Sequence, residues 1–84
     1  MKEERNNSSP DEHLDCTGLY CPVPVFETRK KISSMKEGQI LELVANDPAS
    51  EEDIKAWAKT TGNKLIRVAK DSDNFIFYIK KMYK

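Results

Sequence analysis

The sequence predicts an α+β domain that folds as a two-layer α/β sandwich with the element order β-α-β-α-β-β. Three observations predict this fold. Two stretches carry apolar residues at helical spacing, each follows a short strand-like segment, and a short polar turn joins the last two strand-like segments. Because strand–helix–strand crossovers are right-handed, both helices should lie on one face of the sheet.

The first strand and helix are predicted between residues 12 and 35. Residues 12–16 form a strand that Thr17-Gly18 ends, and Gly18 suits a turn with positive φ. A helix is predicted over residues 22–35, and Gly38 follows it as a C-cap glycine or turn. The buried face of this helix consists of Val25, Thr28, Ile32 and Met35.

The next strand and helix are predicted between residues 39 and 62. Residues 39–45 are almost continuously apolar, which favours a central strand. Asp47 is a candidate cap for a helix with Pro48 in its first position, and Ser50 is an alternative cap. Gly62 ends this helix. The apolar stripe consists of Ile54, Trp57, Ala58 and Thr61.

The C-terminal part of the sequence predicts a β-hairpin. Residues 64–70 and 75–80 read as strands, and the polar residues 71–74 form the turn between them. A turn this short joins antiparallel neighbours.

Length and composition predict one small domain. The chain has 84 residues, of which 1–11 are polar and predicted to be a disordered tail, so the domain spans residues 12–84. The 14 basic and 14 acidic residues cancel, so we expect no direct nucleic-acid partner and no attraction to a membrane. The sequence contains no apolar segment typical of a signal peptide or membrane span, which predicts a cytoplasmic protein.

The chemistry is concentrated in the segment from Leu14 to Pro24. Cys21 directly precedes a Pro-x-Pro step, and Pro22 and Pro24 suit the first turn of a helix. Cys21 should therefore lie at the helix N-terminus, facing unpaired N–H groups and the positive end of the helix dipole. Such a site lowers the pKa of a thiol and favours the thiolate. The alternative is a buried cysteine that only packs.

A second thiol, Cys16, precedes Cys21 by five positions and has two interpretations. It is either packed in the core or a resolving thiol that forms a disulfide with Cys21, which requires Cα atoms within about 7 Å. Asp15 is interpreted as a hydrogen-bonding residue of the turn, and His13 as a surface residue. Two cysteines and one histidine are too few for a closed zinc site, so no metal or other cofactor is expected.

Three landmarks in register carry a resemblance to the SirA/TusA-like sulfur carrier family, which extends over residues 12–82. They are Leu14-Asp15-x-x-Gly18-Leu19-x-Cys21-Pro22-x-Pro24, then Gly38, then Asp47-Pro48-Ala49-x-x-x-Asp53-Ile54 with Trp57 and Gly62. The resemblance implies a four-stranded mixed sheet, similar to the C-terminal domain of translation initiation factor three. It also implies that Cys21 accepts a sulfane sulfur as a persulfide and passes it to a partner protein.

The family resemblance further implies a sulfurtransferase-type carrier rather than a stand-alone enzyme. The implied donor is a cysteine desulfurase or a rhodanese-like protein, and the implied acceptor is another protein, such as a DsrE-like one. Asp15, Gly18, Pro22 and Pro24 would shape the site around Cys21. Family members serve tRNA thiolation, molybdenum cofactor maturation or sulfur oxidation. Cys16 departs from the best-known tRNA-thiolation carriers, which have another residue there.

Two other functions are compatible with the sequence. A Cys16/Cys21 pair would make a dithiol redox module, dependent on both residues. An RNA-binding regulatory module rests only on fold analogy, and the zero net charge disfavours it.

Overall fold

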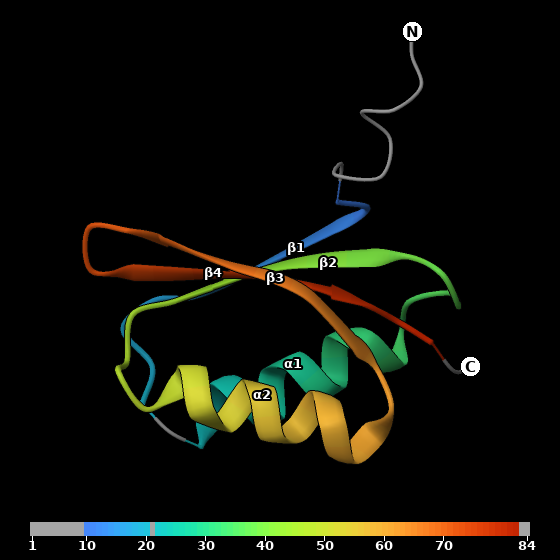
Figure 1. The fold of residues 1–84 in the computed structure, drawn as a ribbon, viewed down its shortest axis with the longest axis horizontal. Coiled ribbons are helices and arrows are strands. Elements are labelled where there is room, and N and C mark those ends of the chain that lie inside the picture. The colour runs from blue at the N-terminus through green and yellow to red at the C-terminus, as the bar shows by residue number, and fades with distance from the viewer. Residues whose placement is uncertain (1–9, 21, 83–84) are drawn as a thin grey trace, which may run out of the picture.

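A computed structural model describes residues 10–20 and 22–82 and confirms the predicted α+β fold. The four strands form one mixed sheet in the order β1-β2-β4-β3, in which β1 and β2 are parallel and the other pairs are antiparallel. Both helices cover the same face of this sheet (Figure 1). The elements are β1 (Glu12–Cys16), α1 (Val23–Ser33), β2 (Ile40–Ala45), α2 (Ser50–Thr61), β3 (Lys64–Asp71) and β4 (Asn74–Lys80).

Helix α1 is shorter at both ends than the predicted 22–35. Its N-cap is Pro22, which has a non-helical ψ of 17°, so the first helical residue is Val23. At the other end, Ser34 donates its hydroxyl to the carbonyl oxygen of Lys31, 2.8 Å away, and Met35 N–H bonds to Ile32 O three residues back. These tighter bonds end the α-helix but keep Met35 turned into the core, where it is 6% exposed.

The predicted start of helix α2 at Pro48 is wrong, because a turn precedes the helix. Asp47 accepts the N–H of Ala49 with its side chain and the N–H of Ser50 with its backbone carbonyl. The helix then begins at Ser50 with Ala49 as N-cap, so neither Asp47 nor Ser50 is the N-cap residue. The predicted end is confirmed, since Gly62 adopts a left-handed conformation with φ 81°.

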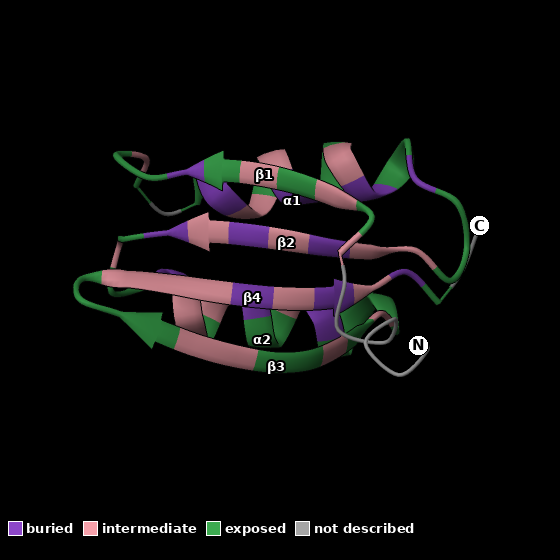
Figure 2. Ribbon diagram, turned by 90° about the horizontal axis from the view of Figure 1, so that it is seen from above, coloured by how far each residue is buried: buried purple, intermediate pink, exposed green. Residues whose placement is uncertain are grey.

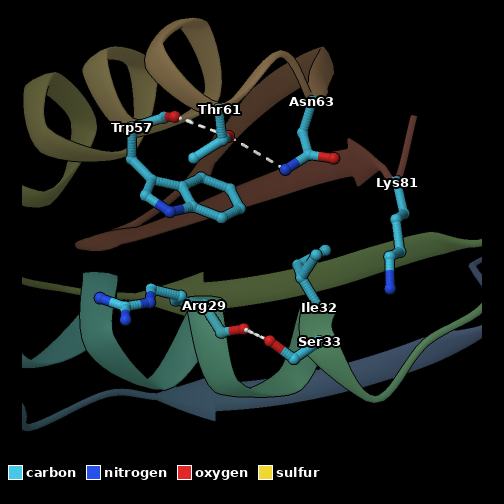
Figure 3. Close-up of a pocket in the computed structure, with 7 residues that line it drawn as sticks. All are labelled: Arg29, Ile32, Ser33, Trp57, Thr61, Asn63 and Lys81. Atoms are coloured by element: carbon cyan, nitrogen blue, oxygen red, sulfur yellow. Dashed lines mark hydrogen bonds between the residues drawn. The ribbon is translucent and has the colours of Figure 1, made fainter. Parts of the chain in front are cut away.

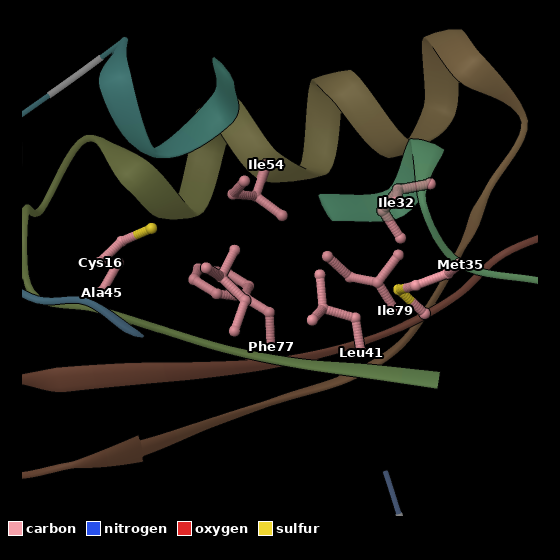
Figure 4. Close-up of a cluster of buried hydrophobic side chains, with 9 residues drawn as sticks. Cys16, Ile32, Met35, Leu41, Ala45, Ile54, Phe77 and Ile79 are labelled. Atoms are coloured by element: carbon pink, nitrogen blue, oxygen red, sulfur yellow. The ribbon is translucent and has the colours of Figure 1, made fainter. Parts of the chain in front are cut away.

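The core lies between the helix layer and the two central strands. Buried and half-buried residues alternate along β2, as expected for a sheet with one covered face (Figure 2). Phe77 on β4 lies in the middle of this core and is completely buried (Figure 4). The predicted stripe of α2 is only partly buried: Ile54 and Ala58 face the sheet, whereas Thr61 is exposed. The core cluster is Cys16, Ile32, Met35, Leu41, Leu43, Ala45, Ile54, Phe77 and Ile79.

Two phenylalanines allow the contribution of core burial to be measured. We expect Phe77→Ala to lower the free energy of unfolding by about 3–5 kcal/mol, because it leaves a cavity between helices and sheet. Urea denaturation followed by circular dichroism measures the loss. The matched control is Phe26→Ala, which removes a side chain that is 55% exposed and should change stability by about 0.5 kcal/mol or less. Equal losses in the two variants would contradict the assigned core.

Candidate functional site at the start of helix α1

The loop that leads into α1 leaves the sheet beside the loop that leads into α2. Strands β1 and β2 are parallel, and Cys16 at the end of β1 pairs with Ala45 at the end of β2. The residue after Ala45 ties the loops together, because Asn46 Oδ1 accepts the N–H of Gly18 at 2.9 Å. The sequence alone did not mark Asn46 as part of this loop. The signal that could have placed Asn46 beside this loop is the parallel pairing of β1 and β2, because two parallel neighbours end on the same side of the sheet.

Asp15 and Gly18 turn the chain between β1 and α1. Asp15 Oδ1 accepts the N–H of Thr17 at 2.9 Å and its hydroxyl at 2.7 Å. These bonds, the backbone one first, lower the pKa of the Asp15 carboxyl below its ordinary value because they stabilise the charged form. Gly18 follows with φ 84°, a left-handed conformation that side chains disfavour. The turn is therefore held by a charged acceptor and a glycine before the chain reaches α1.

Cys21 lies outside the described residues, so the site is defined by its neighbours at the start of α1. Pro22 is the N-cap, and Pro24 in the first turn is buried. The expectation of unpaired N–H groups here is wrong for the described part of the turn. Val23 N–H donates to Tyr20 O at 2.8 Å, and Val25 N–H donates to Pro22 O at 3.1 Å. The positive end of the helix dipole is the local feature that still favours a negative charge at this position.

An apolar rim surrounds this helix start, and we define it as Tyr20, Val23 and Phe26. These side chains are 76%, 38% and 55% exposed, which is high for large apolar groups. The sequence alone did not mark these three residues as a surface. The available signal was their position: Val23 and Phe26 lie three residues apart and off the buried stripe of α1.

Cys16 lies on the helix-facing side of β1 and is fully buried. Its sulfur points from the sheet toward the helix layer (Figure 4). Burial first, then the nearby charges of Glu27 and Asp15, raises the pKa of the Cys16 thiol to about 11. The thiol is thus protonated at neutral pH and out of contact with solvent, as in a packed core cysteine.

The other sequence candidates lie apart from the loop. His13 precedes Cys16 by three positions on β1, so its side chain lies on the opposite, uncovered face of the sheet. There His13 Nδ1 lies 2.6 Å from a carboxylate oxygen of Glu42, with the His13 side chain 69% exposed. Within residues 10–20 and 22–82, no three histidine, cysteine or acidic residues gather as a metal site.

Comparison with known proteins decides the family. A family model described as sulfurtransferase TusA matches residues 12–81. The chain belongs to the TusA family. Its match to the model begins at the first residue of β1 and extends one residue past β4, so it includes every element of the sheet and both helices.

Relatives of this TusA-family chain include proteins named sulfur carrier protein TusA. The one from Allochromatium vinosum is 42% identical over 71 residues, which cover 84% of this chain and 93% of that protein. The one from Pseudomonas putida F1 is 33% identical over 73 residues, which cover 87% and 91%. A relative from Aquifex aeolicus is 45% identical over 75 residues, but this chain spans only 38% of its length.

The fold is shared with a solved structure. The crystal structure of a SirA-like protein from Desulfitobacterium hafniense superposes with a TM-score of 0.75, covering 86% of this chain and 99% of that one. Its sequence identity is 19%, so this likeness concerns the fold. Neither helix in the described part of the chain has the length and apolar character needed to cross a membrane.

The two cysteines should differ sharply in reactivity. In a Cys21→Ser variant at neutral pH, we expect N-ethylmaleimide to modify Cys16 at least about a hundredfold more slowly than a small free thiol, because burial raises the pKa of Cys16 to about 11 and shields its sulfur. Mass spectrometry over time measures the rate. The control is the same variant in urea, where modification should be fast. Rapid labelling of the folded variant would contradict the burial of Cys16.

Proposed function

We propose that this protein is a sulfur carrier in which Cys21 accepts a sulfane sulfur as a persulfide and delivers it to a partner protein. One observation carries the proposal: in a TusA-family chain, Cys21 directly precedes the N-cap proline of α1. The relatives named sulfur carrier protein TusA support the general role. The persulfide and the identity of the cysteine are the parts that we infer.

The transfer is an exchange between two sulfur–sulfur bonds. The Cys21 thiolate attacks the outer sulfur of a donor persulfide, R–S–SH. The donor's S–S bond breaks and R–S⁻ leaves, while a new S–S bond forms at Cys21 and the proton stays on the transferred sulfur. One S–S bond replaces another, so no external oxidant or reductant is needed. Attack by an acceptor thiolate reverses these roles and releases the Cys21 thiolate.

Two features of the helix start suit this exchange. The dipole of α1 favours negative charge at its N-terminus, which would assist both the attacking thiolate and an anionic persulfide. The backbone donors in the described part of the first turn already have acceptors, so this stabilisation is modest. A persulfide held by a few strong hydrogen bonds would be slow to leave. A carrier must release its sulfur, so the weaker stabilisation by the helix dipole alone suits this role better than several strong hydrogen bonds would.

The apolar rim supports docking of donor and acceptor proteins around Cys21. Exposed aromatic side chains are frequent at the centre of protein interfaces, where they bury large areas at low entropic cost. Tyr20 precedes Cys21 directly, and Phe26 lies about one turn into α1. A cysteine desulfurase or rhodanese-like donor, and an acceptor such as a DsrE-like protein, are the partner classes that we propose.

The dithiol redox alternative receives less support than the carrier. A disulfide between Cys16 and Cys21 would require the Cys16 sulfur to leave a completely buried position in the core cluster. Its raised pKa also keeps it from acting as a resolving thiolate at neutral pH. A carrier needs only one working thiol.

Intact-mass spectrometry tests the carrier directly. After incubation with a cysteine desulfurase and cysteine, we expect the wild-type protein to gain the mass of one sulfur atom and to lose it on treatment with a reductant. Cys21→Ser should gain nothing, whereas Cys16→Ala should still be loaded, because its Cys21 is unchanged. Loading of Cys21→Ser at the wild-type level would overturn the proposal.

Transfer kinetics test the apolar rim. We expect Phe26→Ala to reduce the second-order rate constant for sulfur transfer from the desulfurase about fivefold or more, since an interface aromatic commonly contributes about 1 kcal/mol or more. The control is Lys59→Gln, an exposed substitution on α2 that lies off the rim. Equal rates for Phe26→Ala, Lys59→Gln and the wild type would exclude Phe26 from the docking surface.

A further inference from the structure

Asn46 fastens the loop between β1 and α1 to the end of β2. Its side-chain oxygen Oδ1 accepts the backbone N–H of Gly18 at 2.9 Å, across 28 positions of the sequence. Asn46 is exposed, but it follows Ala45, which is completely buried and pairs with Cys16. Figure 4 shows Cys16 and Ala45 side by side at one end of the core. The acceptor is therefore carried by a strand end that is fixed in the core.

Gly18 is a residue at which the loop would otherwise be free to bend. It adopts φ 84°, a left-handed conformation that glycine reaches without strain. Among the residues that the structure describes, a Cβ atom at Gly18 would meet no atom within 4 Å beyond its chain neighbours. The glycine therefore serves the backbone conformation rather than close packing. Because glycine loses more conformational freedom on ordering than other residues, the bond from Asn46 restrains the loop where restraint is needed.

The geometry set at Gly18 carries through to Tyr20 in the apolar rim. Leu19 N–H donates to Cys16 O at 3.2 Å, which ties the loop to the end of β1. Tyr20 O accepts the N–H of Val23 at 2.8 Å, which ties the loop to the start of α1. The direction of the chain at Gly18 therefore decides how Tyr20 is presented relative to the sheet.

We propose that Asn46 is a positioning residue for sulfur transfer. This inference rests on the proposed function, in which the sulfur of a partner must approach the Cys21 thiolate in a defined orientation. A displacement of about 1 Å can reduce the rate of such a step about a hundredfold. The Asn46 amide also supplies its acceptor without a charge. A carboxylate in its place would add a second negative charge near Asp15, and negative charges disfavour a nearby thiolate.

Asn63 offers a matched control at the other end of α2. Its Oδ1 accepts the N–H of Met82 at 3.0 Å, the same type of bond that Asn46 makes. Its amide also donates to the hydroxyl of the last residue of α2 at 3.0 Å. Asn63 lines the groove between α1 and α2, together with Trp57 and the buried Lys81 (Figure 3). The 12 residues of α2 separate this position from Asn46 by about 18 Å.

Transfer and alkylation measured side by side in the full chain test the proposal. With a cysteine desulfurase and cysteine as the sulfur source, we expect Asn46→Ala to lower the second-order rate constant for loading about tenfold. Asn63→Ala should stay within about twofold of the wild type. Alkylation of Cys21 by iodoacetamide should change by about twofold or less in both variants, because a small reagent needs no docking orientation. Mass spectrometry over time measures both rates. Unchanged transfer in Asn46→Ala, or an equal loss of alkylation, would overturn the proposal.

Asn46→Asp tests the hydrogen bond itself, because a carboxylate can still accept the N–H of Gly18. The comparison is made above the pH at which alkylation of Cys21 reaches its plateau, where each variant has formed the thiolate. There Asn46→Asp should be loaded at least about threefold faster than Asn46→Ala. Equal rates would exclude the bond as the cause.

The wild type separates this inference from the proposed function. A wild-type protein that gains no sulfur refutes the carrier, and the role of Asn46 in transfer falls with it. A wild-type protein that is loaded at the same rate as Asn46→Ala refutes only the role of Asn46. Circular dichroism confirms that the compared variants are folded.

Discussion

The parallel pairing of β1 with β2 is the constraint on which the rest of this structure depends. Parallel neighbours cannot be joined by a tight turn, so the chain must cross over the sheet through α1. The same pairing brings the ends of both strands to one edge, where Gly18 N–H meets Asn46. The start of α1 is thereby positioned by the sheet, and its apolar rim is presented to solvent at that edge.

Cys16 has a structural role in the core, whereas Cys21 is the thiol that we propose for the chemistry. Cys16 occupies a helix-facing position of β1, so its thiol is buried in the core. Burial raises the pKa of this thiol, which is therefore protonated at neutral pH and shielded from solvent. Cys21 follows five residues later in the sequence, after the turn that Asp15 and Gly18 form. One short segment thus contains a packing thiol and the thiol that we propose to carry sulfur.

The helix layer has two ends with different chemistry. The start of α1 combines an apolar rim with a positive dipole end, which suits protein partners and a thiolate. Near its other end, a buried ammonium and an aromatic wall line the groove between the helices.

The sequence by itself determined the fold class, the order of the elements and the central position of β2, because hydrophobic periodicity and turn residues are local signals. It also singled out Cys21 through Pro22 and Pro24. Tertiary structure decided the burial of Cys16, the Asn46 tie and the groove around Lys81. Two expectations were also wrong. The described N–H groups at the start of α1 have acceptors, and α2 begins at Ser50 rather than at Pro48. These features depend on which distant residues share an edge or a layer, and that is set only when the sheet and helices pack.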